Sequence, residues 1–261
     1  MLLTTLGTSH GNHTPTRNNS ATLIQTGGAA YLVDCGEPVA ASLERSGKWR
    51  PPIRAVFVTH MHADHIGGLS EFTNMYFKRG AQAERNLTLC LPEEAVTPLR
   101  IWLTAIYQAP ELRPGVLQLQ GVKPGLCFED EHLRASAHPS GHLASQGAAY
   151  QAAGYPNRGE SFSYLLELEG KRVAFTGDLP PTFDHLGELL AEPVALLVME
   201  MTHIQPERAL PFIADKPVDR LVLSHIHDPW HGPGEDRLRD LCSQYLPYPF
   251  VIAYDGMEVE L

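Results

Sequence analysis

Short apolar stretches separated by turn residues dominate the pattern of hydrophobic and polar positions along the chain. Runs of about four to eight apolar or β-branched residues, bounded by Gly, Pro, Asn or Asp, are typical of strands. They predict strands at residues 2–6, 22–26, 29–34, 53–59, 87–91, 115–119, 126–129, 133–137, 162–169, 172–176, 194–199, 221–224, 250–254 and 257–261. Apolar residues at helical spacing predict helices at 66–79, 92–108, 184–191, 206–214 and 235–245. The chain is therefore of the α/β class.

Turn residues between the predicted strands indicate how some of them pair. Gly27-Gly28, Gly170-Lys171 and Asp255-Gly256 each separate two strand-like runs, and we expect each to close an antiparallel hairpin. Residues 140–160, by contrast, are rich in Gly, Ala, Ser and Pro and predict a long loop. Loops of this length are usually functional or mobile. The sequence does not choose between a lid over a site and a contact in a homodimer.

The order of the elements predicts one domain. At ~100–200 residues per domain, a chain of 261 residues makes one large domain or two small ones. No linker, low-complexity tract or tandem repeat divides it. Because hairpins and strand–helix units are mixed in both halves, we expect a single domain over residues 1–261, with two sheets packed together and helices outside them.

The composition disfavours two classes of partner, nucleic acids and membranes. The chain has 30 acidic and 20 basic residues, a net charge of −10. Because nucleic-acid binding relies on Lys and Arg displacing counterions from phosphates, we expect no dedicated nucleic-acid binding. No apolar run approaches the ~20 residues that span a bilayer, and the first residues carry no secretory signal pattern. Four cysteines without a C-x-x-C pair are typical of buried thiols in a reducing cytosol. We therefore expect a cytoplasmic protein with no membrane partner.

Histidine is the informative residue type. Nine of the 13 histidines fall in four short windows, at 60–65, 138–142, 203 and 225–231. The strongest motif is Thr59-His60-Met61-His62-Ala63-Asp64-His65-Ile66-Gly67-Gly68-Leu69, directly after a predicted buried strand. An extended backbone would turn His60 and His62 the same way, while Asp64 and His65 lie where a helix begins. Imidazole and carboxylate groups suit Zn²⁺, Mn²⁺ or Fe²⁺, so the motif predicts ligands for two metals.

This string resembles the H-x-H-x-D-H signature of the metallo-β-lactamase-fold superfamily. Residues 6–8, 17–20 and 32–36 look like the opening of its ribonuclease Z and phosphodiesterase branch. Thr176-Gly177-Asp178 looks like its strand-end aspartate, and residues 221–225 look like the segment that carries its last metal-binding histidine. The resemblance extends over nearly the whole chain. It implies the superfamily fold, an αββα four-layer sandwich of two mixed β-sheets flanked by helices.

The resemblance further implies a binuclear metal centre with a defined ligand set: His60, His62, Asp64, His65, His142, Asp178 and His225. The first metal would be held by His60, His62 and a later histidine, and the second by Asp64, His65 and His225, with Asp178 bridging. The later histidine is His142 or His138. We favour His142, because the family often has a small residue before this ligand and Gly141 precedes it. Asp34 is expected to support the ligand loop by hydrogen bonds, or simply to end a strand.

The expected cofactors are two divalent ions, Zn²⁺ first and Mn²⁺ or Fe²⁺ as alternatives. Two ions ~3.5–4 Å apart can share a water, bring its pKa toward neutrality and supply a hydroxide nucleophile, so Asp64 counts with the catalytic residues as well as the ligands. The leaving group also needs a proton. Glu200-Met201-Thr202-His203 resembles a segment of the phosphodiesterase-like branch. His203 is therefore expected to act as general acid, oriented by Glu200, with a polar helix entrance as the alternative reading.

Two other polar segments would lie near a substrate or form plain surface loops. Residues 227–231, with two histidines and a tryptophan, follow the last expected ligand and could line the substrate mouth. Residues 10–17, with two histidines and an arginine, could contact a substrate phosphate. For both segments the sequence leaves the structural alternative open.

The leading functional hypothesis is a binuclear metal-dependent hydrolase that acts like a phosphodiesterase on a small phosphate ester or cyclic nucleotide. Ribonuclease Z proper is a weaker reading, because its long basic RNA-binding arm has no counterpart and the segment around Lys78, Arg79 and Arg85 is too short. Two alternatives remain: thioester or lactone hydrolysis on the same fold, and a non-catalytic metal-binding scaffold or sensor. The natural substrate, the physiological metal and the oligomeric state are not predicted.

Overall fold

The strands form two sheets, with seven strands each among residues 1–79, 86–112 and 117–261, which the computed structural model describes. Across the first sheet the order is β14 (Glu258–Glu260), β1 (Leu2–Gly7), β2 (Ala21–Gln25), β3 (Ala30–Val33), β4 (Ile53–Phe57), β5 (Leu87–Pro92) and β6 (Leu117–Val122). Across the second it is β13 (Phe250–Ile252), β12 (Leu221–Ile226), β11 (Leu196–Met201), β10 (Lys171–Phe175), β9 (Phe162–Leu168), β8 (Leu133–Pro139) and β7 (Gly125–Glu129).

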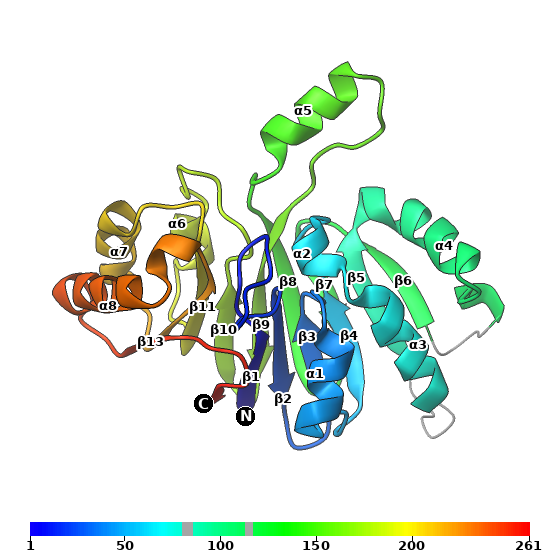
Figure 1. Ribbon diagram of the computed structural model, residues 1–261, viewed down its shortest axis with the longest axis horizontal. Coiled ribbons are helices and arrows are strands. Elements are labelled where there is room, and N and C mark those ends of the chain that lie inside the picture. The colour runs from blue at the N-terminus through cyan, green and yellow to red at the C-terminus, as the bar shows by residue number, and fades with distance from the viewer. Residues whose placement is uncertain (80–85, 113–116) are drawn as a thin grey trace.

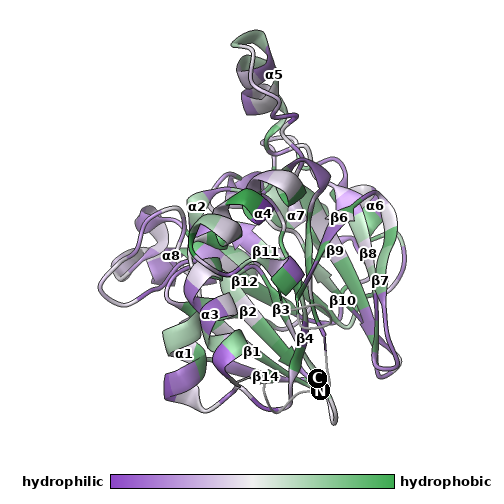
Figure 2. Cartoon of the chain, turned by 90° about the vertical axis from the view of Figure 1, so that its right-hand side faces the viewer, coloured by the Kyte–Doolittle hydropathy of each residue, from purple (hydrophilic) through white to green (hydrophobic). Residues whose placement is uncertain are grey.

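Helices cover the outer face of each sheet (Figures 1 and 2). The first sheet is covered by α1 (Val39–Ser46), α3 (Leu69–Arg79) and α4 (Val96–Ala105). The second is covered by α6 (Leu186–Leu189), α7 (Pro206–Ala214) and α8 (Pro233–Tyr245). Short elements complete the chain: α2 (Ala63–Ile66), α5 (Ala144–Ala152), and the 3₁₀ turns η2 (Glu93–Ala95), η3 (Pro110–Leu112) and η4 (Asp228–Trp230).

The alternation of side chains along the strands explains the layers. On β3, Tyr31 and Val33 point into the core between the two sheets, while Ala30 and Leu32 point toward the helices outside. Because successive side chains of a strand face opposite ways, a strand that is apolar at every position must be covered on both faces. The expected αββα sandwich of two mixed sheets is confirmed.

Parallel pairing brings several strand ends to one edge of the molecule. In the first sheet β3, β4 and β5 are parallel, and in the second β10, β11 and β12 are parallel. The backbone N–H of Phe162 donates to the carbonyl of Thr59 at 2.8 Å, which joins the two sheets at this edge. The loops that follow the parallel strands therefore meet, as ligand-binding loops do at the carboxyl ends of strands in other α/β proteins.

Two predictions from the turn pattern are wrong. Asp255-Gly256 does not close a hairpin: β13 pairs with β12 and β14 pairs with β1, so the chain crosses from one sheet to the other here. Asp255 instead accepts hydrogen bonds from the Asn18 backbone and the Thr8 hydroxyl. Residues 140–160 are not only loop, because α5 forms within them. The other two hairpins, β2–β3 and β9–β10, are present.

The α5 segment forms an arm that projects beyond the layers (Figures 1 and 2). At its base, Gly147 packs so closely on the returning chain that a Cβ would lie 2.4 Å from the carbonyl oxygen of Arg158. Backbone N–H groups at the base also donate to the carboxylates of Glu94 and Glu160. On the arm itself, the rings of Tyr150 and Tyr155 lie 5.5 Å apart and are largely exposed.

Two features of the sequence analysis fall wholly or partly outside the described residues. Arg85 and the first residues of the predicted strand at 115–119 lie outside the described residues. Helix α1, which begins after Pro38 and ends before Gly47, was not predicted. In the described parts of the chain, no helix has the length and apolar character needed to cross a membrane.

Candidate metal centre

The loop after β4 and the short helix α2 supply four of the candidate ligands. His60 and His62 lie on the loop, with ring centroids 4.6 Å apart, and Asp64 and His65 lie on α2. Gly68, which follows α2, lets this loop pack closely against the backbone that follows β3. A Cβ on Gly68 would lie 2.8 Å from the carbonyl oxygens of Cys35 and Gly36. The sequence Gly67-Gly68 therefore serves close backbone packing.

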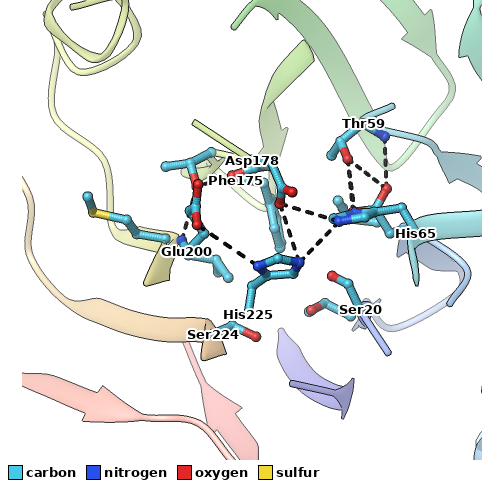
Figure 3. Close-up of a pocket in the computed structure, with 15 residues that line it drawn as sticks. Ser20, Thr59, His65, Phe175, Asp178, Glu200, Ser224 and His225 are labelled. Carbon is cyan, nitrogen blue, oxygen red and sulfur yellow. Dashed lines mark hydrogen bonds and ion pairs between the residues drawn. The ribbon is translucent and has the colours of Figure 1, made fainter. Parts of the chain in front are cut away.

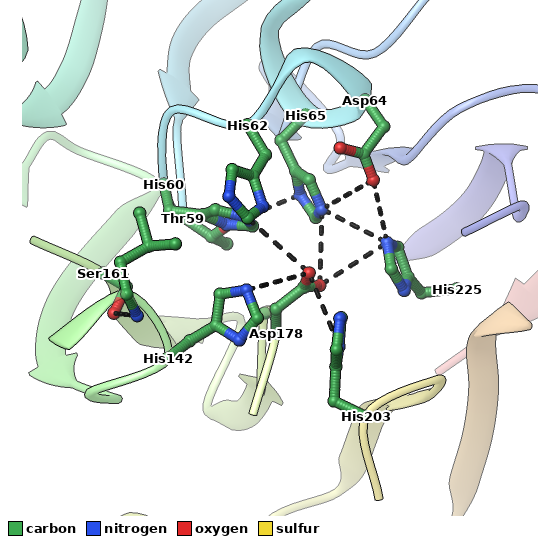
Figure 4. A network of polar contacts seen from close by, with 12 residues as sticks. Thr59, His60, His62, Asp64, His65, His142, Ser161, Asp178, His203 and His225 are labelled. Carbon is green, nitrogen blue, oxygen red and sulfur yellow. Dashed lines mark hydrogen bonds and ion pairs between the residues drawn. The ribbon is translucent and has the colours of Figure 1, made fainter. Parts of the chain in front are cut away.

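One group of potential ligand atoms combines His60, His62, His142 and Asp178, and all four atoms lie within 4.8 Å of one another. The rings of His60 and His142 are 5.0 Å apart, and those of His62 and His142 are 5.4 Å apart. The structure thus places His142, the favoured of the two later histidines, beside the first pair (Figure 4). His138 lies outside every such group in the described residues, because it faces outward from β8.

A second group combines Asp64, His65 and His225. The Nε2 atom of His225 lies 3.2 Å from Nε2 of His65 and 3.1 Å from Oδ2 of Asp64. All three residues are buried, and His225 lies near the end of β12 of the second sheet. The group is therefore assembled from both sheets, at the edge where they meet.

Asp178 lies between the two groups. Its Oδ2 atom is 3.6 Å from Nε2 of both His60 and His142, and its Oδ1 atom is 3.3 Å from His65 and 3.5 Å from His225. Figure 4 shows the carboxylate at the centre of the ring of imidazoles. Each oxygen thus faces one group, which is the arrangement expected of a carboxylate that bridges two ions.

The turn that carries Asp178 is narrowly constrained. Gly177 before it has φ +55°, and a Cβ there would lie 2.9 Å from the carbonyl oxygen of Phe162 and from Cβ of Thr59. Only glycine combines this conformation with this lack of space. Behind the turn, Ser163 on β9 donates its hydroxyl hydrogen to the carbonyl of Thr176 at 2.6 Å.

Hydrogen bonds on the far side of the rings fix which nitrogen faces the centre. The Nδ1–H group of His65 donates to Asp34 at 2.7 Å, and that of His142 donates to the carbonyl of Leu179 at 3.3 Å. Thr202 donates its hydroxyl to the carbonyl of His225, so Nδ1 of His225 is the donor to Thr202 at 3.0 Å. When these rings are neutral, Nε2 carries no hydrogen and its lone pair points toward the carboxylates. This is the hydrogen-bonding pattern of metal-ligating histidines.

Unpartnered atoms at the centre also fit bound cations. Nε2 of His60, Nε2 of His142 and Oδ1 of Asp178 are buried without a hydrogen-bond partner in the described structure. Buried polar atoms are rarely left this way unless an ion or water satisfies them. Imidazoles and carboxylates with lone pairs directed at a common centre are a donor set for divalent transition metals. Asp178 belongs to the first group, and its other oxygen lies 3.3–3.5 Å from the two histidines of the second.

The ionisation states of Asp64, Asp178 and His60 agree with this use. Despite burial, the neighbouring carboxylates raise the pKa of His65 and His225, so these two rings would lose a proton when a metal binds. Burial keeps the pKa of His60 well below its ordinary value, so its ring is neutral. Burial opposes ionisation of Asp178, but His225 and His65 outweigh it and hold the pKa of that carboxyl well below its usual range. Hydrogen bonds from His225 and His65 likewise lower the pKa of Asp64 despite its burial. The acids are therefore charged and His60 is uncharged at neutral pH, as metal ligands require.

Asp34 supports the ligand loop as expected. Besides His65, its carboxylate accepts hydrogen bonds from the backbone N–H of Thr59 at 2.8 Å and from the Thr59 hydroxyl at 3.0 Å. Asp34 is buried and has φ +61°, an unusual conformation for a residue other than glycine. Sequence reasoning assigned no role to Thr59 or Thr202, since a hydroxyl that orients a histidine has no signature of its own.

Glu200 and His203 lie beside Asp178 (Figure 3 shows Glu200). The buried Glu200 carboxylate accepts from the backbone N–H groups of Leu179, Thr202 and His203, and it holds Nδ1 of His203 at 2.9 Å. Nδ1 of His203 is also 3.7 Å from Asp178. Burial lowers the pKa of His203, but the hydrogen bond that it donates to Glu200 and the nearby charges outweigh burial, so the pKa is raised. About a third of the His203 side chain is exposed.

Two of the polar residues considered for substrate contact have structural roles. Arg17 is buried and donates to the Thr8 hydroxyl at 2.9 Å and to the carbonyl of Ala253, which holds the N-terminal loop on the second sheet. Trp230 packs on the apolar cluster between the second sheet and its outer helices, with Arg237 5.5 Å above its ring. For these two residues the structural alternative is the better reading.

Comparison with known proteins gives one relative that aligns over nearly the whole chain and others that align over about half of it or less. Ribonuclease Z of Pseudomonas putida (strain W619) is 28% identical over 304 residues, covering 96% of this chain and 93% of the relative. The anti-Pycsar protein Apyc1 of Saccharibacillus brassicae is 32% identical over 162 residues, covering 56% of this chain and 60% of the relative. In structure, the metallo-beta-lactamase fold protein YhfI from Bacillus subtilis matches with a TM-score of 0.77 at 18% identity, covering 99% and 98% of the two chains.

The Asp34 geometry leads to a test of its supporting role. In Asp34→Asn, the amide oxygen can still accept from Thr59, but the amide nitrogen cannot accept the Nδ1 proton of His65. We expect Zn²⁺ affinity to fall by about 10–100-fold, as for other outer partners of ligating histidines. Chelator competition measures it, with Asp130→Asn, remote from the centre, as the control. Unchanged affinity in Asp34→Asn would show that His65 needs no such partner.

A family model gives the assignment. The model for the beta-lactamase superfamily domain matches residues 30–226, which include every candidate ligand from His60 to His225. The match covers well over half of the chain, and it agrees with the fold and with the relatives. The chain therefore belongs to the beta-lactamase superfamily domain family and is a metal-dependent hydrolase of the metallo-β-lactamase fold.

Proposed function

We propose that the protein is a binuclear phosphodiesterase that hydrolyses a small phosphate ester or cyclic nucleotide. The observation that carries this proposal is the position of Asp178, with one oxygen facing His60 and His142 and the other facing His65 and His225. His60, His62 and His142 would hold one divalent ion, and Asp64, His65 and His225 the other. When bound, two such ions activate a water and stabilise charge on the attacking and leaving oxygens of a phosphoryl group.

Other residues of the chain orient the histidines and supply a proton. Asp34, Leu179 and Thr202 orient the three histidines whose Nδ1 atoms they contact. The large apolar core beneath the loops keeps this edge fixed, which matters because catalytic geometry must be set before the substrate arrives. His203 stands at the rim, more exposed than the ligands and linked to Glu200. Its raised pKa favours the protonated ring, which can donate a proton to the departing oxygen.

The arm favours a small substrate over a structured RNA. The relative that aligns over nearly the whole chain is named a ribonuclease, so RNA is the substrate class to compare with a small phosphate ester. Residues 143–157 of the arm, however, contain no Lys or Arg, and Arg158 at its base is paired with Glu160 at 3.1 Å. Because affinity for an RNA backbone depends on cationic side chains, an uncharged arm provides little of it. Its two exposed tyrosines suit stacking on a single aromatic ring such as a nucleobase.

The proposed activity is tested with bis(p-nitrophenyl) phosphate and protein supplied with Zn²⁺ or Mn²⁺. We expect metal-dependent cleavage, reduced in Asp178→Asn by more than about 100-fold. That loss exceeds the range of about 10–100-fold for a residue that only hydrogen-bonds to a metal ligand. Asp130→Asn, an acid far from the centre, serves as the matched control. If the protein holds two metals per chain and does not cleave the ester, phosphodiester hydrolysis is wrong, and thioesters and lactones become the substrates to assay.

The role of His203 has a separate test. In His203→Ala, kcat on an ester with a poor leaving group should fall by about 10²–10⁴-fold, since that is the usual contribution of a general acid. The loss should be smaller on a p-nitrophenyl ester, whose leaving group needs no proton. Metal content, measured by mass spectrometry, should not change, and His132→Ala is the control. Equal losses on both esters, or a loss of metal, would remove His203 as proton donor.

A further inference from the structure

Gln146, on the α5 arm, contacts the candidate metal centre from its outer side. The Oε1 atom of Gln146 lies 3.2 Å from Nε2 of His62, on the loop after β4. The two residues are 84 positions apart in the chain, so this hydrogen bond joins the arm to the loop that carries the first candidate ligands. Glutamine is not among the usual ligands of zinc. Any effect of Gln146 on an ion must therefore act through the ring of His62.

The hydrogen bond decides which nitrogen of His62 can bind an ion. An amide oxygen only accepts, so Nε2 of His62 carries the ring hydrogen and, in the neutral ring, Nδ1 has the free lone pair. With the amide turned round, its nitrogen would donate to Nε2, the hydrogen would lie on Nδ1, and neither ring nitrogen could bind an ion. In contact with Gln146, His62 can therefore act as a ligand only through Nδ1. It would do so beside the unpartnered Nε2 atoms of His60 and His142.

We infer that Gln146 is a positioning residue of the metal centre. By accepting the Nε2 hydrogen of His62, it turns Nδ1 of that ring toward the ion that His60 and His142 would also bind. Acceptors on the far side of the rings do the same for His65 and His142. The inference rests on the proposed binuclear centre, because it needs the first of the two ions.

Backbone packing at the base of the arm holds Gln146 in place. Gln146 lies in the first turn of α5, and the next residue, Gly147, packs on the chain that returns from the arm. A Cβ on Gly147 would meet the carbonyl of Arg158, and a Cβ on Gly159 would meet the carbonyl of Leu143. Because backbone packs directly on backbone here, the first turn of α5 has a fixed rotation. The side chain at position 146 is thereby kept on the side of the metal centre.

The arm acts on only one of the two candidate ions. It carries His142 as a ligand and, four residues later, Gln146 as the partner of another ligand of the same group. The second group, Asp64, His65 and His225, takes no residue from the arm. Loss of the Gln146 amide should therefore weaken binding of the first ion and leave binding of the second unchanged.

The exposure of Gln146 limits the size of the effect. Its side chain is exposed, so a water molecule can accept the Nε2 hydrogen of His62 when the amide is removed. Such a water is not held in position by a helix. The expected loss of zinc affinity is that of one ordinary hydrogen bond, a factor of about 2–10. This loss is smaller than the one expected for the buried Asp34.

The test compares two substitutions at position 146. Gln146→Met keeps the length of the side chain and removes the acceptor, while Gln146→Glu keeps an acceptor and cannot donate. Gln151→Met, at another exposed glutamine of α5, is the matched control. The dissociation constants of both zinc ions are measured by chelator competition on each full-length protein, without substrate. We expect Gln146→Met to bind one zinc about 2–10-fold more weakly. Gln146→Glu and Gln151→Met should bind both zinc ions at least as tightly as the unaltered protein.

A second background identifies the zinc ion that is affected. His142→Ala removes a ligand of the first ion, so the zinc that stays bound in this variant is held by the second group. Adding Gln146→Met should leave the dissociation constant of that zinc unchanged. Weaker binding of that zinc would overturn the inference, because the effect would not pass through His62. Equal dissociation constants in the unaltered protein and in Gln146→Met would overturn it as well.

Two further comparisons separate this role from stability and from the proposed activity. The metal-free proteins should have equal Tm by circular dichroism, whereas a lower Tm in Gln146→Met would assign its effect to the stability of the arm and overturn the positioning role. The zinc measurements need no turnover. A protein that binds two zinc ions without cleaving phosphodiesters would therefore refute the proposed function and leave the role of Gln146 to be decided by the zinc constants alone.

Discussion

One buried carboxylate, that of Asp178, sets the requirement around which the catalytic edge is built. It contacts the rings of five histidines, His60, His65, His142, His203 and His225, at 3.3–3.7 Å. An ionised carboxylate is costly to bury unless opposite charges or hydrogen bonds surround it. Here the surrounding groups are imidazoles, and Nε2 of His60 and of His142 has no hydrogen-bond partner, which suits divalent ions as further counter-charge. The proposed pair of ions bridged by Asp178 would meet this constraint.

The fold meets the constraint by bringing strand ends from both sheets to one edge. Strand β4 leads to His60 and His62, β10 leads through Gly177 to Asp178, and β12 carries His225 near its end. The positive φ of Gly177 and its lack of room for a Cβ hold the acid at the seam between the sheets. Because each group comes from a different strand of a well-packed core, the distances among them are fixed before any ion or substrate binds.

Most of the ligand set could be predicted from the sequence, because the histidine motif and the later segments occur in a recognisable order. The choice between His138 and His142 needed the structure. His138 lies on the face of β8 that points away from the other sheet, while the chain turns at Gly141, with φ +78°, and brings His142 to the centre. The sequence analysis also missed the helix within residues 140–160, because Gly147 and the flanking Gly and Pro residues obscured an alanine-rich stretch that favours helix. The strands at 250–254 and 257–261 have a hairpin pattern, but they belong to different sheets.

Anomalous diffraction from crystals of the zinc-loaded protein, recorded on both sides of the zinc absorption edge, tests the bridging role of Asp178 most directly. The structure predicts two peaks within the histidine cluster, about 3.5–4 Å apart, with one oxygen of Asp178 bound to each. One of these ions should also contact His142, and the other His225. A single peak in the cluster, or two peaks of which only one contacts Asp178, would contradict the binuclear account.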